Sequence, residues 1–324
     1  MKIGVLGTGA FGVALALILN ENGNEVSMWT KFTEEANYLD QQRRSPNLKN
    51  IIIDDTIKIS TNFKETVEDA ELILIAVPAA FVDDVSQELN KYLKDNQHIC
   101  IASKGIENDS CLFVYDVFKK YIDTDQVGVI SGPTFAIDVA NKVPVGLSLA
   151  STNPDTVSII KQALQNNHVK LRGTDDILGI EICGSIKNVI AIANGMLDGM
   201  DLPISTQAMM ITESLNDIKE LIDALGGDKN TILSFAGFGD LLLTCTSTKS
   251  RNFSFGRLLG KGASQEEIDR YIETTTIEGL YTLKSIYQLL ENKKVNMPII
   301  NLIYDIIYHD KKPIDLLTFL IEKG

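Results

Sequence analysis

The chain has 324 residues, of which 44% are hydrophobic and 23% are charged, so it can form two folded domains with sizeable cores. Its 43 acidic and 30 basic residues give a formal net charge of -13. This charge argues against a nucleic-acid partner, because binding to nucleic acid depends on neutralising phosphates with Lys and Arg. An anionic ligand must therefore be held by a local group of cations.

We expect no signal peptide, because a strand-like run leads directly into a glycine-rich turn. Later apolar runs are shorter than a membrane span or are interrupted by polar residues. The four cysteines, which show neither CxxC spacing nor nearby histidines, are Cys100, Cys111, Cys183 and Cys245. We expect a cytoplasmic protein with reduced cysteines, no membrane span and no metal site.

The first half of the chain alternates short apolar runs with amphipathic segments. Runs typical of strands lie at 2–6, 25–29, 72–77, 98–102, 127–130 and 145–149. Amphipathic segments lie between several of them, for example at 11–20 and 82–93. This alternation predicts an α/β fold with a Rossmann-type, doubly wound and mostly parallel sheet.

The sequence pattern changes after about residue 176, where the apolar runs become longer and their residues are spaced as in a helix. The longest runs lie at 180–197, 204–225 and 278–290, with a helix stop at Gly226-Gly227 and prolines at 298 and 313. We therefore predict a dinucleotide-binding domain over 1–178 and an all-helical substrate domain over 179–324.

The run GTGAFG at 7–12 follows the first strand and opens a helix. In a GxGxxG motif Gly7 permits the tight turn, Gly9 lets the backbone approach a pyrophosphate, and Gly12 lets helix and strand pack closely. Amides at the helix N-terminus then face the phosphates. The strand–turn–helix context predicts dinucleotide binding.

The end of the second strand leaves the choice of cofactor open. An acid is expected there to bind the ribose hydroxyls of NAD, but the sequence has Trp29-Thr30-Lys31. The Lys31 cation suits the 2′-phosphate of NADP, and the alternative is a lysine that is merely solvated.

Turns after three other strands are candidates for the ligand crevice. The strand at 72–77 ends in Pro78, and SKG at 103–105 and SGPT at 131–134 follow two further strands. Such sheets bind ligands at the carboxyl ends of their strands. Each of these turns is ordinary in isolation.

The segment 181–195 is apolar almost all round, which predicts a buried helix with Lys187 and Asn188 in its middle. Gly184, Lys187, Ala191 and Asn194 share one face of this helix, and the small residues leave space beside the amine. Burial favours an uncharged amine, the form that a general base needs. The alternative is a lysine that snorkels from a helix edge.

A second polar concentration lies further along the chain. Arg251 offers a planar fork suited to phosphate, with Ser250 and Asn252 as neutral donors beside it. Asp240 could accept a substrate hydroxyl or orient Lys187. The alternatives are a polar loop at 250–252 and a helix cap at Asp240.

These blocks together resemble the bacterial NAD(P)-dependent glycerol-3-phosphate dehydrogenases. The matching pieces are GTGAFGVALA at the start, SKG at 103, SGPTFA at 131, KNVIAIANGM at 187 and GFGDLLLTCTSTKSRNFSFG from 237. They fall in order and cover nearly the whole chain.

The resemblance implies Lys187 as the catalytic proton acceptor. It implies substrate contacts at Lys104, Gly132, Thr134, Lys187, Asp240, Ser250, Arg251 and Asn252. It implies contacts with NAD or NADP at Ala10, Phe11, Lys31, Lys104, Ala136, Arg251 and Glu278, in addition to the glycines of the turn. A homodimer through the helical domain is a further expectation from the family.

The sequence departs from the family pattern at three positions. Lys31 stands where the family usually has Arg, which keeps the cation and loses the fork. After the lysine helix, Gln207 and Glu213 replace a lysine and an arginine of the family pattern. If either lost cation supports the phosphate or the catalytic lysine, substrate affinity or identity changes.

The expected activity is reversible hydride transfer between NAD(P)H and dihydroxyacetone phosphate, supplying glycerol 3-phosphate for phospholipid synthesis. Lys187 would donate a proton to the developing alkoxide and remove it in the reverse direction. Two alternatives are a related two-domain dehydrogenase of another small hydroxy compound and a non-catalytic dinucleotide-binding protein.

Overall fold

The computed structural model describes residues 1–107 and 110–322, which divide into two compact units. The first unit comprises Met1–Lys104 and Val114–Ile177, and the second comprises Gly105–Phe113 and Leu178–Gly324. The first unit thus ends at residue 177, whereas the predicted first domain ends at residue 178. The second unit also takes in the described residues 105–107 and 110–113, so it is not contiguous in sequence, and the bounds 1–178 and 179–324 stay a prediction.

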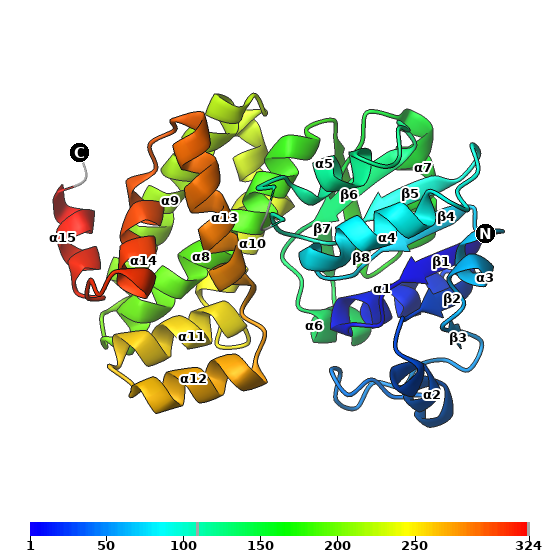
Figure 1. The fold of residues 1–324 in the computed structure, drawn as a ribbon, viewed down its shortest axis with the longest axis horizontal. Coiled ribbons are helices and arrows are strands. Elements are labelled where there is room, and N and C mark those ends of the chain that lie inside the picture. Colours follow the sequence, from blue (N-terminus) through cyan, green and yellow to red (C-terminus); the bar gives the residue numbers. More distant parts are fainter. Residues whose placement is uncertain (108–109, 323–324) are drawn as a thin grey trace. The chain divides into compact units, whose positions relative to one another are not determined.

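The first unit is built on one eight-stranded sheet in the order β3-β2-β1-β4-β5-β6-β7-β8 (Figure 1). Its strands are β1 Lys2–Leu6, β2 Glu25–Trp29, β3 Lys58–Ser60, β4 Leu72–Ile75, β5 His98–Ile101, β6 Val127–Ser131, β7 Val145–Ala150 and β8 Val169–Thr174. All neighbouring strands are parallel except β6 and β7. The mostly parallel, doubly wound sheet is therefore confirmed.

Helices cover both faces of this sheet because its strands are apolar on both sides. They are α1 Ala10–Glu21, α2 Thr33–Gln42, α3 Phe63–Val67, α4 Val82–Leu89, α5 Val114–Lys119, α6 Ala136–Ala140 and α7 Pro154–Leu164, with a 3-10 turn η1 at Ala79–Phe81. On β1, Ile3 and Val5 join a core cluster with α1 and α7. Gly4 points the other way, where an added Cβ would lie 2.5 Å from the Thr66 carbonyl oxygen of α3.

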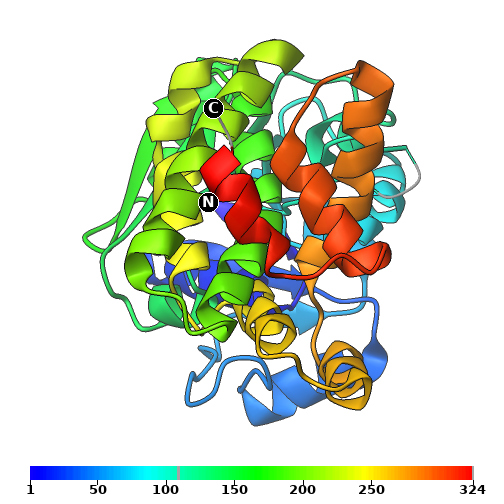
Figure 2. The ribbon, with the colours of Figure 1, turned by 90° about the vertical axis from the view of Figure 1, so that its left-hand side faces the viewer.

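The second unit is helical throughout its described elements (Figures 1 and 2). The elements are α8 Ile177–Gly199, α9 Ile204–Leu225, η2 Lys229–Leu233, η3 Phe235–Gly239, α10 Asp240–Cys245, α11 Arg251–Gly260, α12 Gln265–Thr274, α13 Glu278–Lys293, α14 Pro298–Tyr308 and α15 Asp315–Glu322. Gly226 ends α9 in a left-handed conformation, with φ of 92°, as its position after the last apolar residue predicts. The all-helical second domain is confirmed.

Helix α8 forms the core of the second unit. It is long and apolar enough to cross a membrane, but 94% of that stretch is buried inside the protein. A helix that is apolar all round is typical of the core of a large domain. We therefore describe α8 as a core helix.

Glycines let α8 and α11 pack backbone against backbone. A Cβ added to Gly195 or Gly199 would overlap a carbonyl oxygen of α11, and one added to Gly256 or Gly260 would overlap a carbonyl oxygen of α8. Glycines four residues apart lie on one face of a helix, so each helix offers a flat strip to the other. This close contact brings the start of α11 beside the middle of α8.

Candidate active site

The glycine turn of the first unit has the shape of a phosphate cradle. Gly7 has a φ of 117°, and an added Cβ would lie 2.7 Å from the Ala76 carbonyl oxygen. Nothing lies within 4 Å of the position where Gly9 would carry a Cβ, and no side chain caps the N-terminus of α1. Open space beside uncapped helix amides fits the pyrophosphate of a dinucleotide.

The predicted crevice residues of the first unit lie at one edge of the sheet. Lys31 follows β2, Lys104 follows β5 and Gly132 follows β6. Each of these strands runs in the same direction as β1, because the strand pairs that connect them to β1 are all parallel. The Lys104 ammonium donates to the Gly132 carbonyl oxygen at 3.5 Å and lies 5.9 Å from the centre of the Phe11 ring. The Thr134 hydroxyl donates to the same carbonyl at 3.3 Å.

Two predicted cofactor contacts stand outside that hydrogen-bonded group. Ala136 is the first residue of α6, which packs against α1. The Lys31 ammonium lies 4.5 Å from the centre of the Phe81 ring and 5.4 Å from that of Phe32. Lys31 is exposed, so its cation remains available to an anionic group. No motif in the sequence points to Phe32 or Phe81 as neighbours of this cation.

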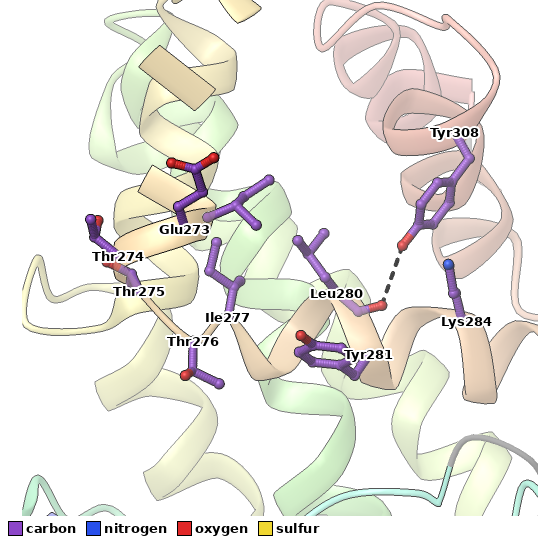
Figure 3. A pocket seen from close by; sticks show the side chains of 10 residues that line it. Glu273, Thr274, Thr275, Thr276, Ile277, Leu280, Tyr281, Lys284 and Tyr308 are labelled. Atoms are coloured by element: carbon purple, nitrogen blue, oxygen red, sulfur yellow. Dashed lines mark hydrogen bonds between the residues drawn. The ribbon is translucent and has the colours of Figure 1, made fainter. Parts of the chain in front are cut away.

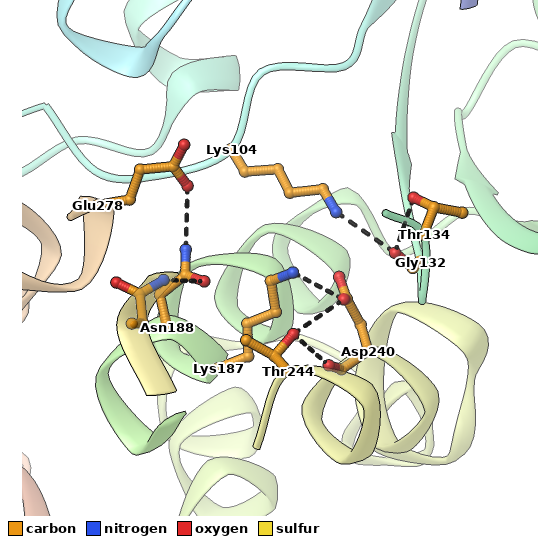
Figure 4. A network of polar contacts seen from close by, with 9 residues as sticks. Lys104, Gly132, Thr134, Lys187, Asn188, Asp240, Thr244 and Glu278 are labelled. Carbon is orange, nitrogen blue, oxygen red and sulfur yellow. Dashed lines mark hydrogen bonds and ion pairs between the residues drawn. The ribbon is translucent and has the colours of Figure 1, made fainter. Parts of the chain in front are cut away.

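In the second unit, Lys187 and Asp240 form a buried ion pair (Figure 4). The Lys187 Nζ donates to the Asp240 Oδ1 at 2.6 Å, and the two side chains are 10% and 1% exposed. The predicted buried helix is confirmed, and the lysine does not snorkel to a helix edge. Asp240 is the first residue of α10, and Gly239 is the N-cap of that helix, so Asp240 takes the predicted position beside Lys187 and not that of the cap.

Asn188, the residue after Lys187, links three helices through its amide (Figure 4). Its Nδ2 donates to the Glu278 Oε2 at 3.2 Å, and its Oδ1 accepts from Asn252 at 3.0 Å. Asn252 in turn accepts from the Gly279 amide at 2.8 Å. The predicted residues Asn252 and Glu278 therefore meet at Asn188, on α8.

The predicted phosphate-binding run differs in how its three side chains are used. Ser250 caps α11, because its hydroxyl accepts from the Phe253 amide at 3.2 Å. Arg251 is about half exposed and donates to the Glu278 Oε1 at 3.4 Å. Of the three residues of this run, Arg251 is the one whose side chain is open to solvent, since Ser250 and Asn252 are buried.

The residues that depart from the family pattern lie on α9. Gln207 donates to the Asp198 Oδ1 at 3.3 Å, and Arg257 lies 2.5 Å from the other oxygen of that carboxylate. Asp198 lies 11 residues beyond Lys187 on α8, which is about 16 Å along a helix. Glu213 is half-buried on α9.

Thr244 and Cys245 complete the surroundings of the ion pair. The Thr244 hydroxyl lies 2.7 Å from the Asp240 carbonyl oxygen and 3.4 Å from its Oδ1. Burial raises the pKa of the Cys245 thiol well above its ordinary value, which marks a site from which water is excluded. The spacing of four between Asp240 and Thr244 on a helix is the signal that could have identified Thr244.

A cavity of about 330 Å³ lies elsewhere in the second unit (Figure 3). The end of α12 and the start of α13 line it, together with Tyr308 of α14, whose hydroxyl donates to the Leu280 carbonyl oxygen at 3.4 Å. Burial, with smaller contributions from Tyr304 and Tyr281, raises the pKa of Tyr308 to about 12. None of the predicted site residues lines this cavity.

A glycine turn at the carboxyl edge of a parallel sheet and a buried Lys–Asp pair in a helical unit define a dinucleotide-dependent dehydrogenase. Residues 2–157 match the model of the NAD-dependent glycerol-3-phosphate dehydrogenase N-terminus, and residues 176–318 match that of the C-terminus. The chain belongs to the NAD(P)-dependent glycerol-3-phosphate dehydrogenase family.

Individual relatives span all or nearly all of the chain. A glycerol-3-phosphate dehydrogenase of a Thermoanaerobacter strain is 36% identical over 100% of this chain and 97% of its own length. That of Staphylococcus epidermidis is 34% identical over 95% and 94%. The crystal structure of the Coxiella burnetii enzyme has a TM-score of 0.93, with 31% identity over 99% and 98% of the two chains.

Proposed function

We propose that the protein is an NAD(P)-dependent glycerol-3-phosphate dehydrogenase that reduces dihydroxyacetone phosphate to glycerol 3-phosphate and catalyses the reverse reaction. The observation that carries this proposal is the buried Lys187–Asp240 pair, with Nζ and Oδ1 2.6 Å apart, in a chain of this family. A lysine buried in the core needs a partner or a function, and this one faces a carboxylate that can hold it in place.

A nicotinamide cofactor held by the glycine turn would supply the hydride to C2 of the substrate, or accept it in the reverse direction. Lys187 donates a proton from Nζ to the oxygen that becomes the hydroxyl group, and it removes that proton in the oxidative direction. Asp240 fixes the amine by the 2.6 Å contact. Positioned proton transfer of this kind contributes about 10²- to 10⁴-fold to the rate.

Arg251 is our proposed main contact of the substrate phosphate. Its guanidinium is half exposed, and its contact with Glu278 at 3.4 Å is long enough for an incoming phosphate to compete with it. The other proposed substrate contacts are Lys104, Gly132, Thr134, Asp240, Ser250 and Asn252. Because Ser250 and Asn252 already make hydrogen bonds within the protein, we assign them mainly to holding Arg251 in position.

The proposed cofactor residues are those of the glycine turn, with further contacts at more distant positions. They are Gly7, Gly9, Ala10, Phe11, Gly12, Lys31, Lys104, Ala136, Arg251 and Glu278. The uncapped N-terminus of α1 and the open space beside Gly9 support the assignment of the turn. The exposed Lys31 cation, between two aromatic rings, suits the 2′-phosphate of NADP without excluding NAD.

The test is oxidation of NADH and of NADPH by the purified protein, followed at 340 nm with dihydroxyacetone phosphate as the acceptor. We expect turnover that depends on this substrate, and much slower turnover with unphosphorylated dihydroxyacetone. Equal rates with and without the phosphate group would favour a dehydrogenase of another small hydroxy compound. Absence of oxidation with either cofactor would leave a non-catalytic dinucleotide-binding protein.

The cellular setting is also part of the proposal. A cytoplasmic enzyme would supply glycerol 3-phosphate for phospholipid synthesis, and its helical unit would form a homodimer. Light scattering coupled to size-exclusion chromatography measures the mass, and a value near that of one chain would contradict the dimer.

A further inference from the structure

Asn194 is a buried amide on α8 that the proposed chemistry does not use. Its side chain is fully buried, and its Nδ2 donates to the Cys245 carbonyl oxygen at 2.8 Å. Its Oδ1 has no hydrogen-bond partner within the part of the chain that the structure describes. Asn194 lies seven residues after Lys187, which is about two helical turns, so the two side chains share one face of α8.

The bond from Asn194 holds the end of α10. Cys245 is the last residue of that helix, so its carbonyl is one of those that a helix leaves without an internal partner. Asp240, the first residue of α10, is paired with Lys187. The helix α10 is therefore fixed to α8 at both of its ends, by an ion pair at the start and by an amide at the end.

The same bond fixes the segment that leads to Arg251. Only residues 246–249 separate Cys245 from Ser250, the N-cap of α11, and the Ser250 amide donates to the Ser247 carbonyl oxygen at 2.9 Å. Gly195, the next residue after Asn194, packs directly against the backbone of α11. Asn194 thus lies at the point where α8 meets both the end of α10 and the body of α11.

The unpartnered oxygen indicates that Asn194 is not there for stability alone. A buried acceptor without a partner lowers stability, and an apolar side chain of the same size would avoid that cost only by giving up the bond to the Cys245 carbonyl. The amide cannot reverse its orientation, because its oxygen would then face the Cys245 carbonyl oxygen. The position therefore gives up stability for one directed hydrogen bond.

We propose that Asn194 is a positioning residue, which sets the distance between Asp240 and Lys187 and the location of Arg251 by holding the Cys245 carbonyl. This role rests on the proposed function. Misplacement of a catalytic group by about 1 Å can lower the rate by 10²-fold. Loss of the bond should therefore act mainly on turnover.

The test compares Asn194→Leu with Asn194→Asp. The leucine variant removes both the donor and the unpartnered oxygen, and we expect kcat to fall by roughly 10- to 100-fold. The urea midpoint should stay near that of the wild type, because the variant loses one unpartnered oxygen at Asn194 and leaves another at the Cys245 carbonyl. The KM for NADH should not change. Leu197→Met, a volume-conserving change of a buried α8 residue, is the matched control and should keep wild-type kcat.

The aspartate variant supplies a second readout. A carboxyl group buried at this position favours its protonated form, whose O–H can donate to the Cys245 carbonyl in place of the amide. We expect kcat close to that of the wild type at pH 6 and a growing deficit toward pH 9 as the group ionises. A purely structural asparagine would give no such pH-dependent recovery.

The outcomes separate the two proposals. An inactive wild-type protein would overturn the proposed function and this role with it. An active wild type whose leucine variant keeps full kcat, or loses stability without losing kcat, would overturn the role of Asn194 alone. If the leucine variant does not fold, the aspartate variant decides. A ratio of its kcat to that of the wild type that stays constant from pH 6 to pH 9 refutes the proposal.

Discussion

Replacement of Lys187 by Met tests the buried ion pair most directly. The substitution removes the ammonium and leaves a side chain of similar length, so the packing around α8 changes little. It leaves the Asp240 carboxylate, which is 1% exposed, without the partner that lies 2.6 Å away. The Thr244 hydroxyl remains near the carboxylate, at 3.4 Å from Oδ1, and cannot replace a full charge.

The expected loss of stability follows from this burial. Removal of one partner from a buried pair costs about 3–5 kcal/mol, because the other charge is left uncompensated. The carboxylate that has lost the lysine can take up a proton, so the loss should be smaller at pH 5 than at pH 8. Turnover should fall by about 10²- to 10⁴-fold, since the proton donor is gone.

A double-mutant cycle with Asp240→Asn separates charge from packing. Urea unfolding followed by circular dichroism gives the free energy of unfolding of the wild type, both single variants and the double variant. Because the double variant carries no charge at either position of the pair, it should regain at least about 2 kcal/mol relative to Lys187→Met alone. Its kcat should remain as low as that of the lysine variant.

Two results would refute this reasoning. If Lys187→Met unfolds at the same urea concentration as the wild type, the pair is not desolvated in solution as the structure has it. If the variant keeps near-normal kcat, Lys187 is not the proton donor, and the assignment of the active site fails.

Three further substitutions test other parts of the structure. Arg251→Ala should raise the KM for dihydroxyacetone phosphate by about 10- to 100-fold, because hydrogen bonds to a charged group contribute about 1.5–3 kcal/mol. If initial-rate measurements give an unchanged KM, another residue binds the phosphate. Gly195→Ala forces a methyl group into the α11 backbone and should lower the free energy of unfolding by about 1–3 kcal/mol or more. Gly173→Ala is its control, because the new Cβ would have its nearest neighbour at 3.6 Å. If thermal melting shows the same loss of stability for both variants, the close packing of α8 against α11 is contradicted. Burial lowers the pKa of His98, so the unfolded chain takes up a proton at a higher pH than the folded one. The free energy of unfolding should therefore fall as pH drops below about 6.5. His98→Gln should make this fall smaller in urea titrations between pH 8 and pH 5. If the free energy of unfolding of the variant depends on pH as steeply as that of the wild type, His98 does not contribute.

The sequence was sufficient to predict the parts of the fold whose residues carry a strong apolar pattern. Strands β1 and β2 have the predicted ends, and α9 has both of its predicted ends, because apolar runs there stop at glycine or polar residues. Strands β3 and β8 were missed. The first is three residues long, and the second alternates buried and exposed side chains with charged residues between, so neither forms an apolar run.

The candidate site was predictable residue by residue but not in its connections. Lys187 was identified as a lysine in an apolar helix, and Asp240 as a possible partner, yet no local pattern specified their pairing across 53 residues of sequence. Asn188 links α8 to α11 and α13 through residues 64 and 90 positions away. Such contacts depend on helix packing, which the glycine strips of α8 and α11 determine only once both helices are formed.

The lost cation at position 207 illustrates the same dependence on packing. From the sequence, Gln207 places substrate affinity in question, because a lysine of the family pattern is absent. In the structure its amide contacts Asp198, near the end of α8, and the Arg257 guanidinium already lies 2.5 Å from that carboxylate. The charge of Asp198 is therefore balanced from α11 instead of α9. About 16 Å of helix separates this contact from Lys187, so the substitution leaves the residues that we assign to proton transfer unchanged.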